Sequence, residues 1–299
     1  MSLYHIPALL SETIKGLDIK KNGTYVDLTF GGGGHSSAIL AELDKGGKLY
    51  SFDQDIDAKQ NILGDDKFCF IHSNFRFMRS QLRVRGVEGV DGILADLGVS
   101  FHHFDVAERG FSFRFDAPLD MRMNQKSSFS AYNVINEYDH KSLLTIFRDY
   151  GELSQPHKIA GAIQRARLEA PITTTFELLQ AVKCVTPPKD ESKFNAKLFQ
   201  AIRIEVNREM EALKMMLEQS AKILNSGGVF AVITYHSLED RLVKNFFRSG
   251  NFEGKIESDI YGNSSSIFER ASKVITASKD EVERNPRSRS AKLRLVKKK

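Results

Sequence analysis

Cysteine is scarce in this chain, which has only Cys69 and Cys184 among its 299 residues. Two cysteines are too few for a disulfide framework or a cysteine zinc site, so the composition favours a reducing compartment. No stretch offers about 18 uninterrupted apolar residues, which excludes an ordinary membrane-spanning helix. The first residues also lack a basic segment followed by an apolar one, so we expect no secretory signal. These absences predict a cytoplasmic protein that needs neither a membrane nor a metal.

Charge of either sign is not in large excess, because the formal net charge is +5. Residues 284–299 contain eight basic side chains and no acidic one, and removing these eight charges leaves −3 for the rest of the chain. A clustered basic arm is typical of a phosphate-binding element, and a solvated chain end has the same composition. Residues 285–290 precede an alternation of apolar and basic residues over 291–296, which predicts an edge strand. The basic loop would then be fixed to a sheet.

Glycine is concentrated at residues 31–34, which are four consecutive glycines. They follow an apolar run over 24–30 and precede a helical pattern over 35–43, so the order predicts a strand, a glycine turn and a helix start. Glycine permits positive φ, and the backbone N–H groups of such a turn approach a ligand closely at a helix N-terminus. A second predicted strand over 47–52 leads to Asp53, about 20 residues past the glycines, where a carboxylate accepts hydrogen bonds from ribose hydroxyls. The combination predicts a nucleotide-like ligand.

Predicted strands alternate with helical patterns in the first part of the chain. Further apolar runs predict strands at 68–71, 90–96 and 229–235. This alternation predicts a doubly wound, Rossmann-like α/β fold with a parallel sheet and ligands at the carboxyl ends of its strands. Asp27, Asp53 and Asp96 lie at or near those ends.

A long helical stretch without a convincing strand interrupts the alternation. We interpret residues 103–197 as an inserted helical domain, with residues 1–102 and 198–299 forming one discontinuous domain. A capping box over 174–177 predicts a helix start within the insertion. Apolar residues then recur at helical spacing from 196 to 224, which predicts one long amphipathic helix that returns the chain to the sheet.

More than one function fits this pattern. A glycine loop with a ribose carboxylate is typical of an NAD-dependent oxidoreductase, but Ser36 stands where the GxGxxG pattern has its third glycine, which disfavours a nicotinamide cofactor. S-adenosylmethionine (SAM) needs the same backbone donors and ribose acceptor, with an adenine slot that Phe75 can supply. The spacing alone leaves both ligands open. The basic tail also suits a non-catalytic RNA-binding factor that assists ribosome assembly.

Seven blocks of sequence, from the glycine loop to the basic tail, carry a more specific signal. They read DLTFGGGGHS (27–36), DLGVS (96–100), ERGFSF (108–113), PLDMRM (118–123), FQAIRIEVN (199–207), YHSLEDR (235–241) and NPRSRSAK (285–292). In content and in order they resemble the MraW (RsmH) family of ribosomal RNA small-subunit methyltransferases.

The resemblance implies a SAM-dependent methyltransferase that methylates the exocyclic N4 of a cytidine in the decoding region of 16S ribosomal RNA. It implies a Rossmann-like methyltransferase sheet, an inserted domain that recognises the substrate, and small-subunit ribosomal RNA or the 30S particle as partner. By position, the family's SAM contacts fall on Gly33, Gly34, His35, Asp53, Phe75 and Asp96. Where the family carries a SAM-contacting glutamine this chain has His103.

Asp96 is the predicted catalytic residue. Cytosine N4 is a poor nucleophile because its lone pair is delocalised into the ring, so a carboxylate beside the amine would orient it and take its proton. The alternative role for Asp96 is a SAM contact without proton transfer.

Aromatic residues that lie close together in the sequence, and basic residues of the resembling blocks, are candidates for RNA contacts. A target base must leave its stack to reach such a pocket, and aromatic rings receive it. The candidate rings are Phe101, Phe104, Phe111 and Phe113. The candidate phosphate ligands are Arg109, Arg122 and Arg203, for which pairing with a nearby acid is the alternative.

Overall fold

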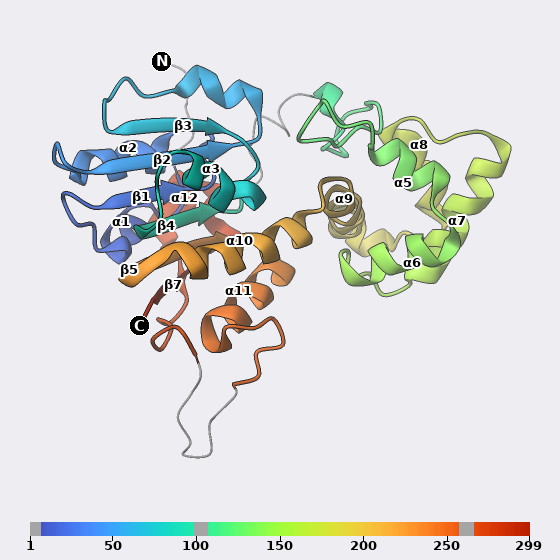
Figure 1. Ribbon diagram of the computed structural model, residues 1–299. Helices are drawn as coiled ribbons and strands as arrows, with labels where there is room; N and C mark the ends of the chain where they lie inside the picture. Colours follow the sequence, from blue (N-terminus) through green and yellow to red (C-terminus); the bar gives the residue numbers. More distant parts are fainter. Residues whose placement is uncertain (1–6, 99–106, 257–265) are drawn as a thin grey trace. The chain divides into compact units, whose positions relative to one another are not determined.

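The computed structural model describes residues 7–98, 107–256 and 266–299 (Figure 1). The chain divides into two compact units. Unit 1 comprises residues 1–98 and 211–299, and unit 2 comprises residues 99–210. Each unit contains a hydrophobic core of its own.

Unit 1 is built on a seven-stranded sheet with the strand order β3-β2-β1-β4-β5-β7-β6. The parallel strands are β1 (Thr24–Asp27), β2 (Lys48–Asp53), β3 (Phe68–His72), β4 (Val90–Asp96) and β5 (Leu224–Thr234). The strand β7 (Lys292–Lys297) runs antiparallel to β5 and to the short β6 (Ile275–Thr276). The order reverses between β1 and β4, which is the switch point where a doubly wound sheet binds ligands. The predicted Rossmann-like α/β sheet is confirmed.

Helices cover both faces of this sheet because successive side chains of a strand point to opposite faces. In β5, Ala231 and Ile233 share a core with α1 (Leu10–Leu17) and α2 (Gly34–Glu42). The intervening Phe230 packs against Phe247 of α11, with ring centroids 5.2 Å apart. The unit also contains α3 (Met78–Val84), most of α10 (Glu209–Ile223), α11 (Ser237–Ser249) and α12 (Lys279–Arg284).

Unit 2 is helical over its described residues. It contains α5 (Ala131–Glu137), α6 (His140–Asp149), α7 (Pro156–Glu169), α8 (Thr175–Val182) and α9 (Glu191–Asn207). The predicted capping box is confirmed: Thr174 Oγ1 accepts from the Glu177 N–H, and the Glu177 carboxylate accepts from the Thr174 N–H. In the described ranges of both units, no helix combines the length and the apolar character needed to cross a bilayer.

The single long helix predicted over 196–224 is wrong. The chain instead forms α9 and α10, separated by Arg208 in the left-handed conformation with φ 49°. An ion pair fixes the break, because Arg203 Nε donates to Glu209 Oε1 at 2.9 Å. The second division between the two units falls after Met210, within the first turn of α10.

The alternating segment over 291–296 forms β7, which is not the predicted edge strand. It lies between β5 and β6, and the edge belongs to the two residues of β6. A strand of two residues carries too little alternation to be recognised in a sequence.

Replacing Thr174 by alanine tests the capping box of α8. We expect Thr174→Ala to lower the free energy of unfolding by about 1 kcal/mol, because the Glu177 N–H loses its acceptor. Thr145→Ala is the matched control, since Thr145 Oγ1 bonds only the Lys141 carbonyl within α6 in the described contacts and alanine favours a helix interior. Urea denaturation followed by circular dichroism measures both variants. Equal losses of stability would contradict a specific capping role.

Candidate functional site

The glycine turn joins the end of β1 to the start of α2. Gly31 and Gly33 adopt φ values of 51° and 77°, a region that favours glycine. Gly33 is the N-cap of α2 and has no side chain, so no capping side chain competes with a ligand for the first N–H groups of the helix. A Cβ on Gly34 would clash with Pro7, so the backbone is tightly packed there. The turn therefore presents a helix N-terminus suited to an anionic or polar ligand group.

A buried polar cluster holds α2 against the ends of β1 and β2. Ser36 Oγ donates to Asp27 Oδ2 at 2.6 Å and lies 2.8 Å from Ser51 Oγ. Asp27 Oδ1 accepts from the Thr29 N–H at 3.1 Å. Burial raises the pKa of Asp27, against the opposing effects of the Ser36 hydrogen bond and of His35. The carboxylate lies at the positive end of α2, where a negative charge is stabilised.

Asp53 approaches the glycine turn from the end of β2. Its Oδ2 accepts from the Gly31 N–H at 2.8 Å, and its Oδ1 accepts from the Asp55 N–H at 2.8 Å. Asn61 Nδ2 donates to the Gly31 carbonyl at 3.0 Å and holds the other side of the turn. A carboxylate has about four lone-pair sites, so one carboxylate can accept from several donors at once, as a ribose acceptor does.

Phe75 follows β3 in a turn that is tied to the Asp53 segment. The Ser73 N–H donates to the Asp53 carbonyl at 2.8 Å, and Asn74 Nδ2 donates to Gln54 Oε1 at 2.6 Å. Asn74 also caps the short 3-10 helix that begins at Phe75. Phe75 is partly exposed. A planar apolar ring therefore lies one strand away from the candidate ribose acceptor, as an adenine slot requires.

His35 is a buried, neutral histidine beside Asp96. It is 5% exposed, and burial lowers its pKa. Its Nε2 lies 3.2 Å from the Ala8 carbonyl, which only accepts, so Nε2 carries the ring proton. The unprotonated Nδ1 lies 3.8 Å from Asp96 Oδ2. This separation is longer than a hydrogen bond.

Asp96 ends β4 at the switch point, and its side chain is 19% exposed. The Asp96 N–H donates to Thr29 Oγ1 at 2.7 Å, and the Gly98 N–H donates to Asp96 Oδ1 at 3.3 Å. Burial raises the pKa of Asp96 to about 6, although hydrogen bonds from the Tyr235 hydroxyl and from Gly98 stabilise the charged form. A reachable carboxyl that titrates near neutrality is suited to accept a proton.

The carboxyl edge of the unit 1 sheet brings together most of the predicted ligand residues. These are Gly33, Gly34, His35, Asp53, Phe75 and Asp96. His103, Phe101 and Phe104 lie outside the described residues. Phe111 belongs to the core of unit 2, and Phe113 packs against Phe199 with ring centroids 5.7 Å apart.

The arginines proposed for phosphate contacts are engaged within unit 2. Arg109 is 6% exposed and donates to the Arg122 carbonyl at 2.9 Å. Arg122 pairs with Asp120 at 2.7 Å. Arg203 pairs with Glu209 as described above. The alternative that nearby acids pair with these side chains therefore holds for Arg122 and Arg203, and Arg109 bonds backbone carbonyls.

Thr29 and Tyr235 are site residues that the sequence did not single out. Thr29 joins the Asp27 and Asp96 strand ends, and the Tyr235 hydroxyl bonds the Asp96 carboxylate from the end of β5. The available signal was positional, because both hydroxyl side chains lie at the end of a predicted strand, at the ligand edge.

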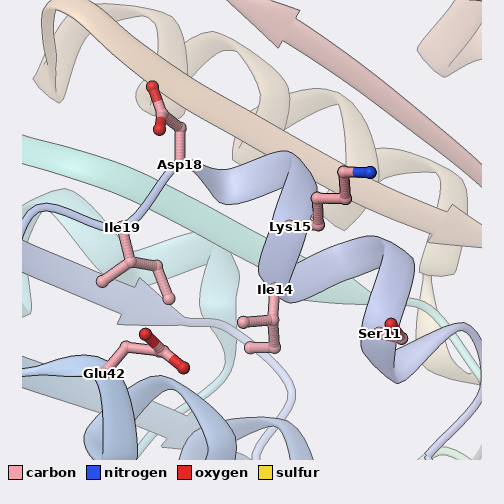
Figure 2. A pocket seen from close by; sticks show the side chains of 6 residues that line it. All are labelled: Ser11, Ile14, Lys15, Asp18, Ile19 and Glu42. Carbon is pink, nitrogen blue, oxygen red and sulfur yellow. The ribbon is translucent and has the colours of Figure 1, made fainter.

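An open hollow of about 530 Å³ lies elsewhere on unit 1 (Figure 2). It is lined by Ser11, Ile14, Lys15, Asp18, Ile19 and Glu42. Glu42 is the last residue of α2, whereas the glycine turn precedes the first. A helix of this length spans about 13 Å, so the hollow is distinct from the carboxyl-edge site.

Comparison with known proteins gives matches along the whole chain. The model of the MraW methylase family matches residues 2–299. A protein from Phocaeicola vulgatus named ribosomal RNA small subunit methyltransferase H is 55% identical over 297 residues, which are 99% of this chain and 98% of that protein. A protein of the same name from Flavobacterium johnsoniae is 55% identical over 295 residues, with 99% and 98% covered.

Replacing Asp53 tests the ribose end of the site. We expect Asp53→Ala to weaken SAM binding roughly tenfold or more, because a hydrogen bond to a charged group contributes about 1.5–3 kcal/mol. The exposed Asp66→Ala is the matched control, since Asp66 contacts Lys48 Nζ only through its backbone carbonyl in the described contacts. Isothermal titration calorimetry measures both affinities. Unchanged binding in Asp53→Ala would remove Asp53 from the site.

Proposed function

The chain belongs to the MraW methylase family, and we propose on this basis that it transfers a methyl group from SAM to the exocyclic N4 of a cytidine in the decoding region of small-subunit ribosomal RNA. The observation that carries the proposal is identity of 55% along almost the whole chain to proteins named ribosomal RNA small subunit methyltransferase H. The carboxyl-edge site supplies residues suited to that chemistry.

The residues of this edge fit SAM. The uncapped N-terminus of α2 suits its carboxylate, Asp53 its ribose and Phe75 its adenine. A Cβ added to Gly31 would meet no atom within 4 Å, so the turn borders open space on that side. When bound, SAM supplies an electrophilic methyl group on a sulfonium centre.

Asp96 is suited to hold the target amine and to take its proton. As N4 gains the methyl carbon it must lose one proton, and an ionised Asp96 carboxylate accepts it. Tyr235 donates to that carboxylate and limits its orientations. The neutral His35 carries its own proton on Nε2, and its Nδ1 lies 3.8 Å from the Asp96 carboxylate.

An oxidoreductase that uses NAD is disfavoured by the same turn. The dinucleotide pattern needs glycine at the position of Ser36, so that helix and strand pack closely. Here Ser36 is fully buried and donates to Asp27, and the polar cluster depends on its hydroxyl.

We propose that the partner is small-subunit ribosomal RNA or the 30S particle that contains it, and that the reaction takes place in the cytoplasm. The name of the relatives supports the RNA substrate.

A methyl-transfer assay tests the reaction and its target together. We expect radiolabelled SAM to label 30S particles isolated from cells that lack the enzyme, and mass mapping to place one methyl group on a cytidine N4. Naked ribosomal RNA assayed in parallel distinguishes the two substrates. RNA binding without methyl transfer to either substrate would favour the non-catalytic assembly factor.

The pH dependence of methyl transfer tests Asp96 as proton acceptor. The pKa of Asp96 is about 6, and only its ionised form accepts a proton, so kcat/KM should rise with pH through about 6 and then level. The Asp96→Asn variant should have a lower kcat/KM, and its kcat/KM should not rise with pH through about 6. Asp91→Asn is the control on the same strand, because Asp91 lies near the amino end of β4 and accepts from the Thr24 N–H at 3.0 Å. If kcat/KM of Asp96→Asn still rose with pH through about 6, the proton acceptor would be another group.

A further inference from the structure

The basic residues of the C-terminal segment separate into two groups along β7. This strand runs antiparallel to β5, so its first residue, Lys292, pairs with Thr234 at the carboxyl edge. Its last residue, Lys297, pairs with Val229 toward the amino edge. Six strand residues span about 17–20 Å, so the charges at its two ends face different parts of the surface.

Several of these basic side chains are occupied within unit 1. Lys292 and Arg294 both approach Asp240, at 3.4 and 2.7 Å. Lys298 Nζ donates to the carbonyls of Ala221 and Leu224 at 2.8 and 2.7 Å, at the end of α10. Their charges fasten β7 to neighbouring elements and are not presented to a partner.

Arg287 and Arg289 are both exposed, and they lie on a short 3-10 helix, Pro286–Ser290, which we call the arginine arm. The intervening Ser288 is fully buried and its Oγ donates to the Asn285 carbonyl at 2.8 Å. Burial of the middle residue leaves the two arginines on the exposed side of the arm.

The arm has a fixed place at the carboxyl edge. Leu293, three residues past its end, is in register with Ile233, which is in register with Asp96. Two strand spacings separate Asp96 from Leu293, or roughly 10 Å. The preceding helix α12 is tied to the start of α1, since the Leu9 N–H donates to Glu281 Oε1 at 2.7 Å. The arm therefore lies beside the proposed reaction site on a rigid support.

We infer that the arginine arm binds phosphates of the ribosomal RNA strand that carries the target cytidine. Guanidinium groups match phosphate in geometry as well as in charge. Phosphate contacts position a strand without reading its sequence, so the arm sets where the nucleotide enters and Asp96 acts on the base. This inference rests on the proposed function.

The test compares equal losses of charge at the two ends of β7. We expect the double variant Arg287→Ala with Arg289→Ala to raise KM for the RNA substrate roughly tenfold with kcat unchanged, because the contacts hold the strand and not the reacting atoms. The slope of log K against log salt should become shallower by about 1.4–1.8, as expected for two lost phosphate contacts. Restoring the charge with lysine at both positions should recover most of the slope.

The double variant Lys297→Ala with Lys299→Ala is the matched control, because it removes the same charge near the amino edge. We expect its RNA affinity, salt slope and SAM affinity to equal those of the unchanged protein. If the two double variants lost RNA affinity equally, the arm would contribute only nonspecific electrostatic attraction, and the inference would be overturned. A normal KM in the arginine variant, or a loss confined to kcat, would also overturn it. Absence of methyl transfer by the unchanged protein would instead refute the proposed function, and RNA binding would still report on the arm.

Discussion

The reversal of strand order between β1 and β4 is the constraint on which the site depends. Parallel strands place their carboxyl ends on one edge, and the reversal leaves a crevice there because the connecting helices leave in opposite directions. The glycine turn follows β1, and the strands on either side of β1 deliver Asp53 and Asp96. The strand order therefore determines which side chains meet at this edge, and the chemistry of the site depends on that placement.

Buried hydrogen bonds convert this topology into fixed positions. Ser36, Asp27 and Ser51 join α2 to two strands, and the cluster is sealed from water. Each such bond contributes only about 1 kcal/mol net, but a buried group left without a partner costs about 1–3 kcal/mol. The cluster therefore selects one placement of α2, and with it the direction of the helix N-terminus that faces a ligand. Thr29 extends the same network to Asp96.

The sequence predicts the local part of this arrangement. Strand patterns and the residues that end them are short-range features, so Asp53 and Asp96 are found by their position at strand ends. Partners from distant segments are not predictable in this way: nothing near Asp96 in the sequence indicates that Tyr235 bonds its carboxylate or that His35 faces it.

Tertiary contacts also override periodic patterns. The apolar spacing over 196–224 continues through Arg208, yet the helix ends there because the Arg203–Glu209 pair and Asn207, whose Nδ2 donates to the Met121 carbonyl, stabilise the turn. Similarly, the alternation of β7 reveals a strand but not its neighbours, so its inner place in the sheet depends on β6, which is too short to recognise.

The raised pKa of Asp96 lowers the stability of the fold above pH 6 and makes its carboxylate a stronger base. Its pKa is raised from 3.8 to about 6. Between pH 3.8 and pH 6, therefore, the folded protein keeps a proton on Asp96 that the unfolded chain has already released. The favourable contribution of the protonated form is therefore complete below about pH 4 and is lost as the pH rises through 6. Above that pH the ionised carboxylate costs the fold on the order of 2–3 kcal/mol. The same incomplete solvation makes the carboxylate a stronger proton acceptor, and the hydrogen bonds from Tyr235 and Gly98 keep the cost tolerable while they hold the group in place. A better solvated aspartate at this strand end would stabilise the fold and weaken the base.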